Sequence, residues 1–305
     1  MKQIKVICPH CSERGHIEMP EDSVKDVTRG LLAVNIASGI ICPHDFIMYI
    51  DRNFQIRDYF TTDFQIELPE ISPPKKFEDL KLPEKDVINI DLIKLNLPAI
   101  LIVHLLKSLF LKKEITLIVD SDLSFLNNHL INFFNYVTRD SFDFEITIIT
   151  SEEYKKNKKE YKDTMVFEGN TIIRNVKKLI DPKKLKIERH IVMKFLTETD
   201  LAYSYLIFKN EIQKAHFLAK SIADYLNNYE EIEKPKSKVI SGDSMIASIL
   251  ENVVSKEKVI TMIVSDYLKK EHDVKIHKDY LHFLIDIVEH YFDADIQKKF
   301  EMTAI

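Results

Sequence analysis

The residues best suited to chemistry in this chain are its three cysteines, which all fall within the first 42 of 305 residues. Cys8-Pro9-His10-Cys11 is followed by the near-repeat Cys42-Pro43-His44-Asp45. Two cysteines separated by two residues can hold one metal ion from a single tight turn, and a second pair of ligands completes a tetrahedron. Because thiolate and imidazole groups suit zinc, the spacing predicts a structural zinc site that includes Cys8, Cys11 and Cys42.

The segment around these cysteines resembles the zinc-ribbon family, in which two short turns called zinc knuckles carry the metal ligands. A predicted strand leads into Cys8 and Cys11, Gly15 follows shortly after, and Cys42 matches the first ligand of a second knuckle. The resemblance covers residues 1–68 only. It implies a small β module that is stabilised by zinc.

The fourth ligand is not fixed by the pattern, because Asp45 stands where the zinc-ribbon family has its fourth cysteine. The candidates are His44 and Asp45, and His10 and His16 also remain open. We favour His44, since structural zinc prefers sulfur and nitrogen donors.

A redox function is the main competitor of the metal site, because Cys-Pro-His-Cys also occurs as a redox motif in the thioredoxin family. That chemistry needs the first cysteine at a helix N-terminus, where the helix dipole favours the thiolate. Gly15 and Pro20 interrupt any helix after Cys11. The sequence therefore favours metal binding.

A second metal site is conceivable at Asp120 and Asp122, which follow a predicted strand over 115–119. Carboxylates at the end of a strand in an α/β sheet lie where ligands bind, and such a pair can hold Mg²⁺. The segment resembles, incompletely, the metal motifs of haloacid-dehalogenase-type phosphatases and von Willebrand A domains. It implies an alternative function as a Mg²⁺-dependent phosphoryl-transfer or nuclease-type enzyme. In the structural alternative, Asp122 caps a helix over 123–137.

A basic segment gives a third alternative. Residues 151–190 contain twelve Lys and Arg against seven Asp and Glu, although the whole chain has a net charge of −5. Such a segment could bind nucleic acid together with the zinc module. Its aromatic residues are sparse, so base stacking is not indicated. We favour a solvated helix face as the explanation of these charges.

Composition excludes several classes of protein. The chain has five glycines, and their spacing fits neither a dinucleotide-binding nor a P-loop motif. The most apolar stretch, 98–111, is shorter than the roughly 20 residues of a membrane-spanning helix. The N-terminus lacks the apolar run of a secretion signal. We therefore expect a cytoplasmic protein that does not enter a membrane.

The predicted elements give an α+β or α/β multidomain protein in four parts. A zinc-binding β module (1–68) precedes a Pro-rich linker (69–90), an α/β domain with a mixed or parallel sheet (91–196) and a helical region (197–305). Within these parts the predicted elements are the following. Strands are expected over 4–7, 31–41, 46–50, 54–60, 115–119, 144–149, 164–167, 171–174 and 185–195, and helices over 98–112, 123–137, 198–229, 243–254, 257–270, 277–292 and 294–300.

No catalytic residues are predicted, because none of the candidate constellations outweighs its structural explanation. The sequence therefore favours a non-enzymatic interaction or regulatory protein with a structural zinc site. We expect a protein partner or self-association, with nucleic acid as the alternative partner.

Overall fold

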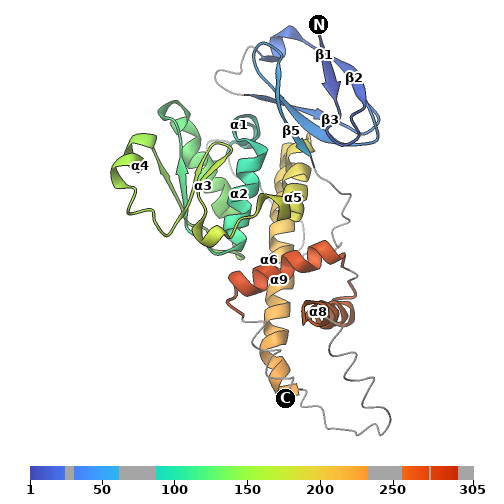
Figure 1. The fold of residues 1–305 in the computed structure, drawn as a ribbon, viewed down its shortest axis with the longest axis vertical. Helices are drawn as coiled ribbons and strands as arrows, with labels where there is room; N and C mark the ends of the chain where they lie inside the picture. The colour runs from blue at the N-terminus through green and yellow to red at the C-terminus, as the bar shows by residue number, and fades with distance from the viewer. Residues whose placement is uncertain (25–30, 62–86, 233–255, 275, 295–305) are drawn as a thin grey trace. The chain divides into compact units, whose positions relative to one another are not determined.

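In the computed structural model the chain is an α+β protein, described here for residues 1–24, 31–61, 87–232, 256–274 and 276–294 (Figure 1). The described residues form two compact units, divided between Ile212 and Gln213. Most of the predicted linker, 69–90, lies outside the described residues.

The N-terminal part of the first unit is a β module of two small antiparallel sheets. The strands are β1 (Lys2–Ile7), β2 (Arg14–Met19), β3 (Leu32–Ile36), β4 (Phe46–Ile50) and β5 (Ile56–Thr61). β1 pairs with β2, and β3, β4 and β5 form a separate sheet in that order. The central strand β4 is buried at every residue, and apolar residues from both sheets form one core. The strands expected over 46–50 and 54–60 are present as β4 and β5, which pair with each other.

A four-stranded sheet lies at the centre of the following α/β part. Its strands are β6 (Ile115–Ile118), β7 (Ile146–Ile149), β8 (Met165–Glu168) and β9 (Thr171–Arg174), in the order β7-β6-β8-β9. β6 is parallel to β7 and β8, whereas β9 forms an antiparallel hairpin with β8. The expected mixed sheet is thus present.

Helices pack on this sheet through a large aromatic and aliphatic core. They are α1 (Ile90–Asn96), α2 (Ala99–Phe110), α3 (Asn127–Val137), α4 (Ser151–Asn157) and α5 (Lys186–Thr197). α2 is buried at every residue except Ile100, and most of its residues are apolar, as expected of a core helix. Phe133 of α3 lies 5.3 Å from Phe195 of α5, measured between ring centroids.

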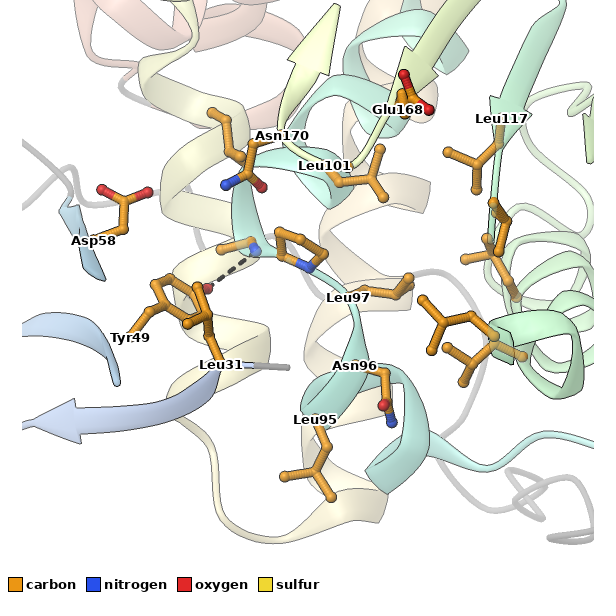
Figure 2. A pocket seen from close by; sticks show the side chains of 18 of the residues that line it. Leu31, Tyr49, Asp58, Leu95, Asn96, Leu97, Leu101, Leu117, Glu168 and Asn170 are labelled. Carbon is orange, nitrogen blue, oxygen red and sulfur yellow. Dashed lines mark hydrogen bonds between the residues drawn. The ribbon is translucent and has the colours of Figure 1, made fainter. Parts of the chain in front are cut away.

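Side chains hydrogen-bond to the first backbone amides of two of these helices. Thr150 and Glu153 form the reciprocal capping box that opens α4, which satisfies two backbone amides at the start of that helix. At the start of α2, Tyr49 Oη accepts a hydrogen bond of 3.0 Å from the backbone N–H of Ala99 (Figure 2). The second bond joins the β module to the α/β part.

Two predictions for this part are wrong. Residues 185–195 form most of helix α5 instead of a strand, because Ile187, Ile191 and Phe195 are buried at helical spacing. The helix expected from 123 begins as a 3-10 helix, η3 (Ser121–Leu126), and becomes α-helical only at Asn127. Asp120, not Asp122, occupies the N-cap position, and its side chain makes no capping hydrogen bond.

The remaining helices are α6 (Leu201–Ile232), α8 (Lys256–His272) and α9 (Lys278–His290). They agree with the helices expected over 198–229, 257–270 and 277–292. The helix expected over 243–254 lies outside the described residues, as does nearly all of that expected over 294–300.

Within the described part of the chain, no single helix is both long and apolar enough to cross a membrane. Only α1 and α2 taken together, with a bend of 111° between them, have the required length and composition.

Candidate metal centre

The first loop of the candidate site joins β1 to β2 and carries Cys8 and Cys11. It is closed by two backbone hydrogen bonds, from Ser12 N–H to the Cys8 carbonyl at 2.9 Å and from Cys8 N–H to the Glu13 carbonyl at 2.8 Å. Ser12 adopts a left-handed conformation with φ of 63°, which reverses the chain tightly. Both thiols are therefore held on one short turn.

The second loop joins β3 to β4 and carries Cys42 and His44. Gly39, with φ of 89°, donates its N–H to the Cys42 carbonyl at 2.9 Å. Gly15 allows the two loops to approach, because a Cβ atom there would lie 2.9 Å from Cγ1 of Ile41. A larger residue at either glycine would disturb the loops.

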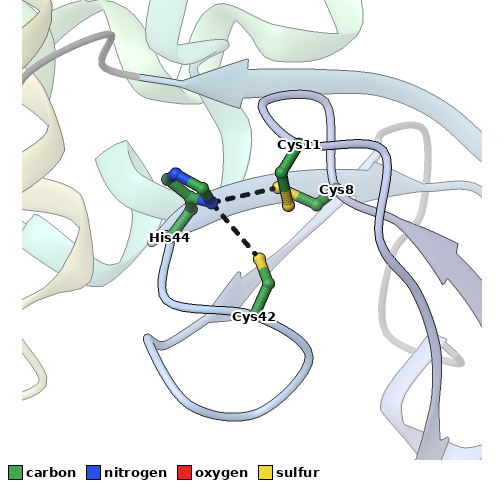
Figure 3. A group of neighbouring side chains, drawn as sticks. All are labelled: Cys8, Cys11, Cys42 and His44. Carbon is green, nitrogen blue, oxygen red and sulfur yellow. Dashed lines mark hydrogen bonds between the residues drawn. The ribbon is translucent and has the colours of Figure 1, made fainter.

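The two loops bring Cys8, Cys11, Cys42 and His44 together, with all four ligand atoms within 4.8 Å of one another (Figure 3). His44 Nδ1 lies 3.5 Å from Cys42 Sγ and 3.9 Å from Cys8 Sγ. In a tetrahedral zinc site the ligand atoms are separated by about 3.5–3.8 Å, given Zn–S and Zn–N bonds of about 2.3 and 2.0 Å. The four side chains could therefore hold a metal ion with little rearrangement.

The other candidates for the fourth position lie differently. Asp45 Oδ1 accepts a hydrogen bond of 2.6 Å from Ser38 N–H, so this carboxylate closes the β3–β4 loop. The His10 ring stacks on His44 with 4.8 Å between centroids. His16 lies on β2, opposite Lys5. Among the described residues, Cys8, Cys11, Cys42 and His44 form the one group of three or more potential ligands that converge.

The thiols of Cys8 and Cys42 lie in different electrostatic surroundings. Burial works to raise the pKa of Cys8, but backbone N–H groups of Cys11 and His10 donate to its sulfur and lower the pKa below its ordinary value. Burial raises the pKa of Cys42 to about 11, and the neighbouring Cys8 and Cys11 thiols add to the effect. A bound metal ion would stabilise the thiolate forms, because cysteines lose their protons when they coordinate a metal.

The four donors fit a closed structural site. Three sulfurs and one imidazole nitrogen fill a tetrahedron, which leaves no open position for water or substrate.

No known protein family matches the chain, and neither does any curated protein or solved structure.

Asp120 and Asp122 are not brought together with a third carboxylate or histidine in the described part of the chain. Asp120 and Asp122 are both exposed. Asp120 follows β6 and lines a cavity, whereas Asp122 lies outside the cavity lining and accepts a hydrogen bond from Ser121 Oγ at 3.4 Å. The Mg²⁺ site stays a prediction.

The basic segment 151–190 is accessible over much of its length. Its exposed lysines lie around α4 and in the turns after β9: Lys155, Lys156, Lys158, Lys159, Lys162, Lys177, Lys178, Lys183 and Lys184. Tyr154 is buried and so offers no stacking surface to a base. Nucleic-acid binding remains untested.

Two features are missed by sequence reasoning. One is the cavity that Asp120 lines, which is built from segments far apart in the chain. The other is a hydrogen-bonded trio in the second unit, where Ser221 Oγ lies 2.8 Å from His272 Nε2 and 2.7 Å from Tyr267 Oη. His272 Nδ1 makes no hydrogen bond with a described residue, so nothing there orients it as a catalytic base.

Proposed function

We propose that Cys8, Cys11, Cys42 and His44 bind one structural zinc ion in a module of the zinc-ribbon type. The convergence of these four ligand atoms carries the proposal. Zinc is favoured over harder cations because three of the four donors are thiols. Its role is structural, since no coordination position is left for a reacting molecule.

The position of the ligands explains what the metal stabilises. Cys8 and Cys11 lie on the loop that joins β1 to β2, and Cys42 and His44 lie on the loop that joins β3 to β4 in the other sheet. The metal therefore links two small sheets whose shared core contains nine buried residues. A structural zinc ion can supply on the order of 10 kcal/mol of apparent folding free energy, which a module of this size needs.

We further propose that the chain works without catalysis, as an interaction or regulatory protein that contacts a protein partner or a second copy of itself. What supports this is the donor set, which fits a structural metal, and two exposed apolar side chains on or beside the two loops. Ile7, beside Cys8, is 39% exposed, and Ile40, on the second loop, is 56% exposed. Apolar side chains at such positions are available for a protein contact.

Two experiments test these proposals separately. Treatment with a zinc chelator should unfold residues 1–61 and make them sensitive to protease, while the β6–β9 sheet stays protected. If both parts stay protected from protease after chelation, the metal does not have a structural role. In sedimentation and pull-down experiments, Ile40→Asp should keep its metal but lose self-association or partner binding. The interaction function would be contradicted if the wild-type protein is monomeric and if Ile40→Asp binds every partner as well as wild type does.

A further inference from the structure

A cavity of about 640 Å³ lies within the first unit, at the carboxyl ends of β6 and β8. Its walls also include the junction between α1 and α2 and residues of β4 and β5. Figure 2 shows this junction, at Leu97, passing between Tyr49 and Asp58 on one side and Leu117 and Glu168 on the other. The volume is in the range of small-molecule sites.

The position of the cavity in the sheet is one at which α/β proteins bind ligands. After β6 the chain passes to β7 on one side, whereas after β8 it passes to β9 on the other side. The connections that follow the adjacent parallel strands β6 and β8 therefore diverge. Such a point leaves a crevice outside the carboxyl ends of the strands, where ligands bind.

The lining of the cavity combines an apolar wall with an excess of negative charge. Much of the wall consists of leucines: Leu97, Leu101, Leu117, Leu123, Leu126 and Leu130. The charged side chains among the described lining residues are the carboxylates of Asp58, Asp120 and Glu168 and the guanidinium of Arg189. Arg189 lies over the Phe60 ring, 5.5 Å from its centroid, on the side of the β module.

The carboxylates at the strand ends have room for a cationic partner. Asp120 makes no side-chain hydrogen bond or ion pair with another described residue, although it stands at the N-cap of η3. Glu168 accepts a hydrogen bond of 2.8 Å from Ser151 Oγ, which leaves lone pairs for a second donor. An anionic ligand such as a nucleotide would meet like charge here, and the glycine-rich loop that cradles phosphates is missing from the sequence.

We propose that this cavity binds a small organic cation, with an apolar body against the leucines and an ammonium or similar group against Asp120 and Glu168. The apolar wall favours an organic cation over a bare metal ion, which would need a shell of oxygen ligands. The inference does not rest on the zinc site, because both carboxylates lie on the α/β part.

The test uses two fluorescent probes of opposite charge on the metal-replete full chain. Dansylcadaverine carries a primary amine, and 6-(dansylamino)hexanoic acid carries a carboxylate on the same fluorophore. We expect the amine to bind at least about 10-fold more tightly, with a blue-shifted emission. Asp120→Asn and Glu168→Gln should each weaken its binding about 5- to 10-fold. The control Asp122→Asn should not, because all three carboxylates are exposed but Asp122 does not line the cavity.

Three outcomes would overturn the proposal. The amine probe could fail to bind or bind no better than the acid. Its binding could be unaffected by Asp120→Asn and Glu168→Gln. Finally, Mg²⁺ at or below about 1 mM could displace it through Asp120, which would assign the carboxylates to a divalent-cation site.

Discussion

Tyr49 of the β module and Ala99 of the α/β part are joined by a hydrogen bond of 3.0 Å between the phenol oxygen and the backbone N–H. The first amides of a helix have no partners within the helix, and Ala99 is buried at the start of α2. Burial raises the pKa of Tyr49 to about 12, so the phenol stays protonated at neutral pH. The module thus satisfies a buried amide of the neighbouring core.

Tyr49→Phe should therefore destabilise the protein by about 1–3 kcal/mol, the cost of leaving a buried donor without a partner. Urea unfolding followed by fluorescence measures the change. Tyr203→Phe is the matched control, since Tyr203 is 55% exposed, and it should change stability by less than about 0.5 kcal/mol. Equal stabilities of Tyr49→Phe and wild type would show that this bond contributes nothing.

A buried ion pair between helices α2 and α5 gives a second prediction. Lys107 Nζ lies 3.1 Å from Glu188 Oε1, with side chains only 10% and 2% exposed. Glu188→Gln should cost about 3–5 kcal/mol, because it leaves a buried ammonium without its counter-charge.

The control for this pair is Asp163→Asn, which breaks the exposed contact of 3.8 Å between Lys162 and Asp163 and should cost less than about 1 kcal/mol. Thermal unfolding of both variants measures the difference. If Glu188→Gln and Asp163→Asn lose similar amounts of stability, burial does not make the Lys107–Glu188 ion pair more costly to break.

His104 should make the fold sensitive to acid. Its side chain is 3% exposed and stacks on Phe167, and neither ring nitrogen has a hydrogen-bond partner among the described residues. Burial, with a smaller contribution from Arg189, lowers its pKa to about 4.

Because the folded state binds a proton at His104 less readily than the unfolded state, stability should be complete above about pH 6.5 and fall between pH 6.5 and 4. At about 1.4 kcal/mol per pKa unit the loss is on the order of 3 kcal/mol. His104→Leu should flatten the profile of unfolding free energy against pH over this range, whereas His16→Gln, at an exposed site, should leave it steep. An unchanged slope in His104→Leu would exclude this histidine as the cause.

Local sequence signals predicted most of the elements and the convergence of Cys8, Cys11, Cys42 and His44. Particular residues explain where these signals failed. The run around Ile187, Ile191 and Phe195 is rich in β-branched residues, which favours a strand, but its burial follows helical spacing. The start of α3 differs from the predicted start because the six-residue 3-10 helix η3 precedes it. The cavity had no local signal, because Tyr49, Leu97, Leu117 and Glu168 come from separate segments.

The fourth metal ligand can be determined by substitution. The preference of zinc for nitrogen favoured His44, and the hydrogen bond from Ser38 to Asp45 gives that carboxylate a different role. His44→Asn should therefore weaken Co²⁺ binding by at least about 10-fold and alter the Co²⁺ absorption spectrum. Asp45→Asn and His10→Asn should keep the tetrahedral spectrum. A spectrum lost in Asp45→Asn but kept in His44→Asn would reverse the assignment.

The most direct test of the central claim is the metal content of the purified full chain, measured by plasma mass spectrometry after removal of free metal. The convergence of Cys8, Cys11, Cys42 and His44 predicts one zinc ion per chain. Cys42→Ser should lose the metal, and the loop variant Asp45→Asn should keep it. A wild-type protein that contains no zinc, and takes up none when it is refolded with zinc, would contradict the account.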